Sequence, residues 1–283
     1  MNRVVRFTSI IVIILASIAS IVFQPIQLAS TMPTSVTQPS TSVNIAQKID
    51  FRRHFQALGV NGSIMIYDTS NDRVFEYNPQ RNKTAFLPAS TFKILNSLIA
   101  LETGVIADEV AVLTWDGINR PLVPGWNRDL NMREAMKLSA VWFYQVLARR
   151  VGHDRMQQWV SKVGYGNQKI GGKNDIDKFW LEGELRITPQ QQVQFLRRLY
   201  KNDLPFSDRS ISIVKDILTV EKTPDYSIRA KTGWDGSIAW YVGYLERGKN
   251  AYFFATNLDL PNQKNLPTRI ELTRRCLKDL SAL

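Results

Sequence analysis

The chain has 283 residues, of which 44% are hydrophobic and 22% are charged, a composition typical of a folded globular protein. Its net charge is +11, but the basic residues are scattered without a long run, so no nucleic-acid partner is indicated. The single cysteine, Cys276, excludes an internal disulfide, and His54 and His153 have no second ligand at metal-binding spacing, so no metal site is expected. No G-x-S-x-G motif is present, which disfavours a serine–histidine–acid hydrolase.

The first 30 residues have the features of an export signal. Two arginines precede an apolar run at residues 10–23, and small residues follow it. The run is shorter than the roughly 20 residues of a membrane helix, although an uncleaved N-terminal anchor is an alternative. Residues 31–44, rich in Ser, Thr and Pro, are predicted to be a flexible spacer. We therefore expect an exported, periplasmic or extracytoplasmic protein with one folded domain at residues 45–283.

The predicted elements of this domain run in the order strands, helices, strands. A short amphipathic helix at residues 49–58 ends at a glycine, residues from about 105 to 200 have a helical pattern, and an amphipathic helix at 266–280 closes the chain. Strands are expected at residues 62–67, 73–77, 226–232, 238–246 and 251–258. The last three strands are joined by connections of hairpin length, which need no crossover helices. The sequence thus predicts an α+β fold, a central antiparallel sheet flanked by N- and C-terminal helices with an inserted all-helical region.

A serine and a lysine three residues apart, Ser90 and Lys93, lie near the start of a predicted helix. Pro88 ends any preceding element, and residues 92–103 form an apolar helical pattern closed by Gly104. Because residues i and i+3 share a helix face, the amine is placed beside the hydroxyl. An ordinary lysine is protonated at neutral pH and cannot take the hydroxyl proton. The pattern therefore predicts a nucleophilic serine only if a dry pocket lowers the pKa of the lysine.

The Ser-x-x-Lys pattern also occurs a second time, so it is weak evidence alone. The second copy, Ser212 with Lys215, lies in a polar helix with no other site-like residues around it. Between the two copies, Ser139 is followed two residues later by Val141, which pairs a hydroxyl with an apolar side chain inside the helical region.

A third pattern, Lys231-Thr232-Gly233, ends a predicted strand of alternating character. A glycine there lets a ligand lie beside the strand edge, while the lysine and threonine face an anionic group. The order of the three patterns along the chain is more informative than any one of them.

These motifs resemble those of the class D (oxacillinase-type) serine β-lactamases, in the penicillin-recognising enzyme superfamily. Penicillin-binding proteins and class A β-lactamases share the first and last patterns but have Ser-Asp-Asn in the middle, where this chain has Ser139-Ala140-Val141. The resemblance extends from Phe55 to the end of the chain. Its motifs are Pro88-Ala89-Ser90-Thr91-Phe92-Lys93, Ser139-Ala140-Val141, Tyr165-Gly166-Asn167, Phe179-Trp180-Leu181-Glu182-Gly183 and Lys231-Thr232-Gly233-Trp234.

The resemblance implies a role for each residue of the site. Ser90 would be the nucleophile, Lys93 the general base after carboxylation by carbon dioxide, and Ser139 the donor of a proton to the lactam nitrogen. No metal or organic cofactor is implied. The carbamate pocket would be lined by Phe92, Val141, Leu181 and Trp180, whose indole N–H could hold the carbamate. The substrate would be bound by Lys231, Thr232, Gly233 and Arg269. The oxyanion hole would use the backbone N–H groups of Ser90 and Trp234.

The implied function is hydrolysis of the β-lactam amide of penicillin-type antibiotics, with resistance as its consequence. Two alternatives share these motifs: an extracellular penicillin-sensing domain that is acylated without turnover, and a penicillin-binding cell-wall peptidase. A sensor carries several membrane segments, whereas this chain has at most one, and a peptidase has Ser-Asp-Asn or Ser-x-Asn as its middle motif, where this chain has Ser139-Ala140-Val141. A degenerate, inactive relative is disfavoured by the intact motifs. Oligomeric state and preference among penicillins, cephalosporins and carbapenems stay open.

Overall fold

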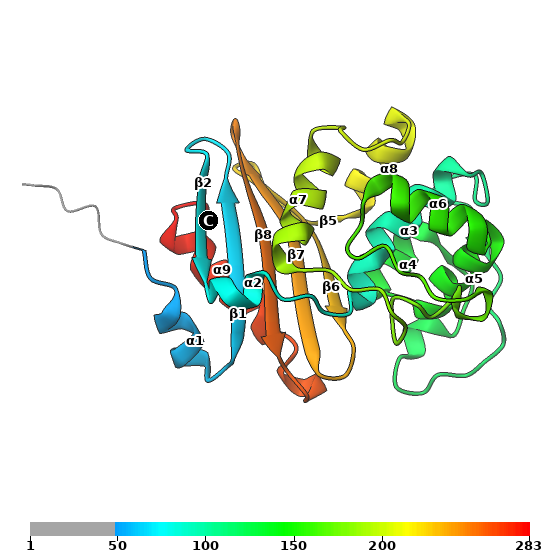
Figure 1. The fold of residues 1–283 in the computed structure, drawn as a ribbon, viewed down its shortest axis with the longest axis horizontal. Coiled ribbons are helices and arrows are strands. Elements are labelled where there is room, and N and C mark those ends of the chain that lie inside the picture. Colours follow the sequence, from blue (N-terminus) through cyan, green and yellow to red (C-terminus); the bar gives the residue numbers. More distant parts are fainter. Residues whose placement is uncertain (1–48) are drawn as a thin grey trace, which may run out of the picture. The chain divides into compact units, whose positions relative to one another are not determined.

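A six-stranded sheet forms the centre of the computed structural model, which describes residues 49–283 (Figure 1). The predicted signal peptide (1–30) and spacer (31–44) lie outside the described residues. The strand order is β2-β1-β8-β7-β6-β5, and every neighbouring pair is antiparallel, which confirms the predicted fold class. The strands are β1 (Gly62–Asp68), β2 (Arg73–Tyr77), β5 (Thr219–Lys222), β6 (Ser227–Trp234), β7 (Ile238–Arg247) and β8 (Asn250–Asp259).

The edge strand β5 was not predicted. It has only four residues, too few for an alternating pattern to stand out from the helix before it. A second difference is a short hairpin inside the predicted helical region, formed by β3 (Val112–Leu113) and β4 (Leu130–Asn131). Within residues 49–283, no helix is long and apolar enough to cross a bilayer.

The sheet separates two hydrophobic cores. Successive side chains of a strand point to opposite faces, so Trp240 and Tyr241 of β7 belong to different cores. On the face of Tyr241 pack α1 (Arg52–Leu58) and α9 (Thr268–Asp279), and on the face of Trp240 packs α7 (Pro189–Tyr200) (Figure 1). The predicted flanking of the sheet by N- and C-terminal helices is thereby confirmed.

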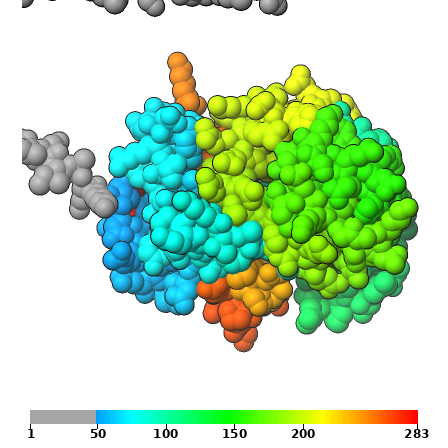
Figure 2. Space-filling view, viewed as in Figure 1, coloured from blue at the N-terminus to red at the C-terminus, as the bar shows by residue number. Residues whose placement is uncertain are grey.

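The remaining helices lie on the α7 side of the sheet. Figure 2 shows α4 to α6, in green, gathered in one lobe beside the strands. The helices are α2 (Pro79–Asn82), α3 (Lys93–Glu102), α4 (Met132–Leu138), α5 (Val141–Val151), α6 (His153–Val163) and α8 (Asp208–Ile217). Short 3-10 turns are η1 (Ala89–Phe92), η2 (Pro124–Trp126), η3 (Lys173–Asp175) and η4 (Gln263–Asn265).

Local signals fix where α7 begins. The Thr188 side chain accepts a hydrogen bond from the Gln191 N–H, and the Gln191 side chain accepts one from the Thr188 N–H, forming a capping box. Pro189 occupies the first helical position, where its missing N–H costs nothing. This start places Gln192 and Val193 on the buried face of the helix, against the sheet.

Replacement of Gly243 by Ala tests how closely the central strands pack. A Cβ atom there would lie 2.3 Å from the Arg229 carbonyl oxygen and 2.6 Å from the Ala230 Cβ, so the backbone of β6 would have to move. We expect Gly243→Ala to lower the free energy of unfolding by about 1–3 kcal/mol, measured by urea denaturation. The control is Gly125→Ala, whose Cβ would be 3.5 Å from its nearest neighbour and should change stability by less than about 0.5 kcal/mol. Equal effects at both positions would contradict the prediction.

Candidate active site

Ser90 lies in the 3-10 turn η1, directly before α3 begins at Lys93. The predicted helix therefore starts one residue later than expected. Ala89, the residue before the serine, has φ +48°, a left-handed conformation that is unfavourable for a side chain with a Cβ. Its N–H donates to the Trp180 carbonyl oxygen at 3.0 Å, which holds the backbone in this state. Strain of this kind is concentrated at functional sites.

Side chains from distant segments hold this turn in place. The Thr91 hydroxyl donates to the Pro88 carbonyl at 2.7 Å and accepts from the Gln192 amide at 2.8 Å. The Trp240 indole donates to the Leu87 carbonyl at 2.8 Å. Neither Gln192 nor Trp240 was predicted as a site residue. In the sequence, the feature that could have identified Gln192 is its position on the apolar face of a predicted helix, where glutamine is unusual. In the structure this side chain is fully buried.

Gly233 allows β6 to approach the same turn. A Cβ at this position would lie 3.1 Å from the Pro88 carbonyl oxygen and 3.1 Å from the Thr91 Cγ2. The space beside the glycine is thus filled by the turn that carries Ser90 (residues 89–92), not left open as the strand pattern alone implied. The Lys-Thr-Gly strand therefore packs directly against the residues on either side of Ser90.

The amine of Lys93 is buried and bonded to the serine. Its side chain is fully buried, and its Nζ donates to the Ser90 Oγ at 2.7 Å. Burial holds the pKa of Lys93 well below its usual range, and the charge of nearby Lys231 lowers it further. This shift favours the uncharged amine, which is the form that can accept a proton. The structure supplies the dry pocket that the Ser-x-x-Lys pattern requires.

The second copy of the pattern has no such environment. Ser212 is exposed on α8, and the Lys215 amine donates to the Tyr200 carbonyl at 2.7 Å and to the Asn202 side chain at 2.5 Å. Lys215 therefore joins α8 to the end of α7 and has a structural role.

Aromatic residues wall the region around α3. Phe92 stacks on Trp180, with ring centroids 5.4 Å apart, and Phe179 meets Phe92 edge-on at 5.0 Å. Leu181 packs against the same core, and Val141 is the first residue of α5. Trp180 is fully buried, and its indole N–H has no hydrogen-bond partner within residues 49–283. An unpaired buried donor costs about 1–3 kcal/mol, so this N–H points to an acceptor supplied by another group.

Ser139 is hydrogen-bonded to Lys231 of the Lys231-Thr232-Gly233 motif. It caps the C-terminus of α4 with φ +56°, and its Oγ accepts a hydrogen bond from the Lys231 Nζ at 2.9 Å. Lys231 also donates to the Thr232 carbonyl at 2.9 Å. Burial, with the nearby charge of Arg269, lowers the pKa of Lys231 to about 7. Arg269 donates to the Gly233 carbonyl at 3.1 Å, and burial lowers its pKa to about 10, so it stays charged at neutral pH.

The edge of β6 next to these residues is open. The Asp235 N–H donates to Ile238 across the hairpin to β7 at 3.3 Å, while the Ala230 N–H points the other way, to Leu218 at 2.9 Å. Because N–H directions alternate along a strand, the Trp234 N–H faces the same side as that of Ala230. The paired part of β5 stops before this point. The Trp234 N–H is thus directed to the open edge.

The Tyr165-Gly166-Asn167 motif joins two loops. The Asn167 N–H donates to the Arg186 carbonyl at 2.9 Å, its side-chain oxygen accepts from the Arg186 N–H at 3.0 Å, and its amide donates to the Glu184 carbonyl at 2.9 Å. These bonds fix the chain that follows Trp180 and Leu181.

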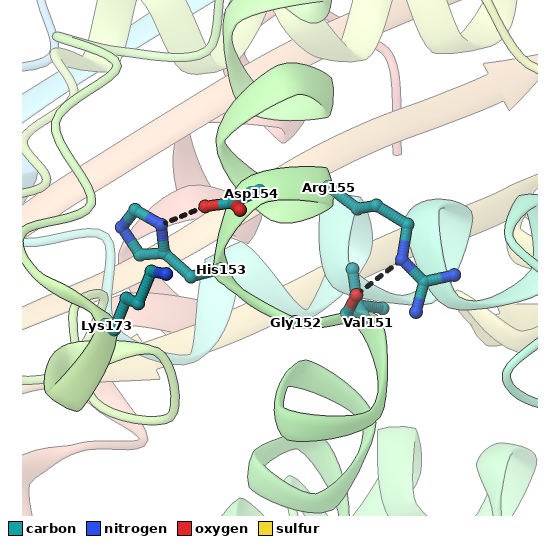
Figure 3. Close-up of a pocket in the computed structure, with 6 residues that line it drawn as sticks. All are labelled: Val151, Gly152, His153, Asp154, Arg155 and Lys173. Carbon is teal, nitrogen blue, oxygen red and sulfur yellow. Dashed lines mark hydrogen bonds and ion pairs between the residues drawn. The ribbon is translucent and has the colours of Figure 1, made fainter.

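A separate cavity of about 450 Å³ lies at the start of α6 (Figure 3). The His153 ring lies 3.0 Å from an Asp154 oxygen on one side and 3.0 Å from the Gly171 carbonyl on the other, and Arg155 donates back to Val151 at 2.6 Å. Its polar groups thus bond within the cavity wall. Within residues 49–283, no three side chains form a metal-binding group. The lining residues are Val151, Gly152, His153, Asp154, Arg155 and Lys173.

Comparisons with known proteins agree with this geometry. The penicillin-binding protein transpeptidase domain family matches residues 60–278. The chain is 42% identical over 243 residues to β-lactamase OXA-5 of Pseudomonas aeruginosa, covering 83% of this chain and 90% of that protein. It is 41% identical over 247 residues to β-lactamase OXA-48 of Klebsiella pneumoniae, covering 86% and 92%.

Among solved structures, the class D β-lactamase YbXI from Nostoc superposes with a TM-score of 0.81 at 55% identity, covering 83% of this chain and 100% of that one. The similarity in sequence and the similarity in fold thus extend over similar shares of this chain, 83–86%. At this identity and coverage, the chain belongs to the class D serine β-lactamases.

Proposed function

We propose that this protein hydrolyses the β-lactam amide of penicillin-type antibiotics through an acyl-enzyme on Ser90, with Lys93 as the general base after carboxylation by carbon dioxide. The observation that carries the proposal is the fully buried amine of Lys93, 2.7 Å from the Ser90 hydroxyl, whose pKa burial lowers well below its usual range. Hydrolysis of the antibiotic would make the cell that produces the enzyme resistant to it. The export signal predicted at residues 1–30 would deliver the enzyme outside the cytoplasm.

In acylation, the base on Lys93 would take the Ser90 proton, the Ser90 oxygen would form an ester with the lactam carbonyl carbon, and the lactam C–N bond would break. Charge developing on the carbonyl oxygen would be stabilised by the N–H groups of Ser90 and Trp234, each worth roughly 3 kcal/mol in related chemistry. Ser139 would give its proton to the lactam nitrogen and recover one from Lys231, which already donates to it. The substrate carboxylate would be attracted by Lys231 and Arg269, since neither forms an ion pair with any acidic residue within 49–283.

The pocket around Lys93 fits a carbamate. Only an uncharged amine reacts with carbon dioxide, and burial favours the uncharged form of Lys93 by lowering its pKa. The indole N–H of Trp180, buried and unpaired among the described residues, would donate to the group, while Phe92 and Leu181 exclude water from the same core. The carbamate would supply an anionic base for acylation and deacylation.

Steady-state turnover distinguishes this function from that of a penicillin sensor. We expect the purified protein to hydrolyse nitrocefin continuously, because a base beside Ser90 can activate the deacylating water. Lys93→Met keeps the side-chain volume but removes the base, so its turnover should fall by at least about 100-fold. One burst of wild-type acylation without turnover would favour the sensing domain, and cleavage of a cell-wall stem peptide would favour the peptidase.

Activity should depend on bicarbonate and fall with acidification. Burial lowers the pKa of Lys93, which favours the neutral amine, and protonation of the amine as the pH falls through that lowered pKa prevents carboxylation. We therefore expect kcat to rise when bicarbonate is added at constant ionic strength, and to fall at low pH unless bicarbonate is raised. Equal rates in bicarbonate-free and bicarbonate-rich buffer would contradict a carboxylated lysine.

Trp180→Phe should weaken carboxylation of Lys93 while keeping an aromatic ring at position 180 to pack in the core. The variant loses the unpaired N–H but keeps a ring to stack on Phe92. We expect kcat in ambient bicarbonate to fall at least about tenfold, with partial recovery in excess bicarbonate. Trp159→Phe is the matched control, because Trp159 stacks on Phe206 at 4.7 Å and should show the wild-type bicarbonate response. A loss that bicarbonate does not relieve would exclude this role for Trp180.

A further inference from the structure

His153, the first residue of α6, lies between two hydrogen-bond acceptors in the cavity of Figure 3. Its Nδ1 is 3.0 Å from an Asp154 carboxylate oxygen, and its Nε2 is 3.0 Å from the Gly171 carbonyl oxygen. An ionised carboxylate and a carbonyl can only accept, so both bonds form only when both ring nitrogens donate. A neutral imidazole has one N–H and the protonated ring has two. The geometry therefore fits the charged form of His153.

The groups that face the ring act on its charge in both directions. The hydrogen bond to Asp154 is the first cause that raises the pKa of His153 above its ordinary value, and the Gly171 carbonyl raises it further. Desolvation and the charge of Lys173 act against them, as does the positive end of the α6 dipole. The raised pKa means that the favourable contacts are stronger, so the ring keeps its second proton to a higher pH than a free histidine does.

Other charged groups of the neighbouring elements form bonds of their own. Arg155 of α6 points away from the ring (Figure 3), and its guanidinium donates to two backbone carbonyls of α5 at 2.6 and 2.8 Å. Arg149 of α5 is paired with Asp177. The Asp175 carboxylate accepts from the Gly172 N–H at 3.0 Å. The proton on His153 is therefore governed mainly by Asp154, Gly171 and Lys173.

The bond to Gly171 joins α6 to the segment that follows the helix, residues 164–178. Backbone bonds continue from this point toward the active site: the Asp175 N–H donates to the Gly172 carbonyl at 2.9 Å, and the Phe179 N–H donates to the Asp175 carbonyl at 2.8 Å. The segment thus leads from His153 to the aromatic residues around α3.

A second side chain of α6 holds the same segment without a titratable group. The Gln157 amide donates to the Gln168 carbonyl at 3.0 Å. Of these two side-chain links between the helix and the segment, only the one from His153 depends on a proton.

We propose that His153 is a proton-dependent link, which holds the segment 164–178 on α6 while its ring is doubly protonated and releases Gly171 when the ring becomes neutral. A bond to a charged acceptor is stronger than one to a carbonyl, so the proton that remains is the one shared with Asp154. The Nε2 lone pair then faces the Gly171 oxygen, and the two repel. This inference is independent of the proposed function.

The protonation of the ring can be measured directly by NMR. The chain has only two histidines, and a His54→Gln variant identifies the signals of the other one. We expect His153 to titrate with a midpoint above the ordinary value of about 6.5, and the neutral ring to carry its proton on Nδ1. Asp154→Asn keeps an acceptor oxygen but removes the charge, so it should move the midpoint to lower pH. A midpoint at or below about 6.5, an unchanged midpoint in Asp154→Asn, or a neutral ring protonated on Nε2 would overturn the proposal.

The link should also appear in thermal stability. Because the pKa of His153 is raised in the folded state, its stabilisation is fully present below about pH 6.5 and is lost as the pH rises through the raised value. We expect the loss of Tm in His153→Ala to be about 2–4 °C larger at about pH 6 than at about pH 9. Gln157→Ala is the matched control, since it removes the other link and should lower Tm equally at both pH values. Equal losses at the two pH values in His153→Ala, or the same pH dependence in both variants, would contradict a proton-dependent link.

Discussion

The Lys93 amine forms a hydrogen bond with the Ser90 hydroxyl, and it is fully buried away from water. This burial favours the uncharged amine, the form that can take up a proton. Burying an ionised amine without a partner costs several kcal/mol, so the group gives up its proton instead. The aromatic residues around α3 and the neighbouring charge of Lys231 act in the same direction. Burying Lys93 therefore costs free energy of folding, and the packing of the rest of the fold must offset that cost.

Several segments contribute to this stability by fixing the turn that carries the serine. Gln192 from α7 and Trp240 from β7 bond its flanking residues, while Gly233 lets β6 touch it directly. The left-handed Ala89 is held by a bond to Trp180, so the wall of the pocket and the conformation of the turn depend on each other. A change in one of these contacts would therefore shift the backbone of the turn, and with it the position of Ser90.

The end of β5 gives the sheet an edge that is available to ligands. An exposed strand edge invites pairing with other chains, and here the region beyond it is bordered by α4, α8 and α9 rather than by another strand. The buried Lys231 and the half-buried Arg269, which donates to the Gly233 carbonyl of β6, lie near this edge. The open edge thus lies beside the two residues proposed to bind the substrate carboxylate.

The sequence by itself determined the order of elements, the antiparallel sheet and the motif residues, because hydrophobic periodicity and turn residues are local properties. It also identified Ser90, Lys93, Ser139 and Lys231 as a set, through the order of their motifs and their resemblance to a family. It could not separate Ser90 from Ser212 by the pattern alone: only the packing buried Lys93 and left Ser212 exposed. The strained Ala89, the support from Gln192 and the reason for Gly233 were decided by the tertiary structure, since each depends on contacts between segments about 90 to 145 residues apart.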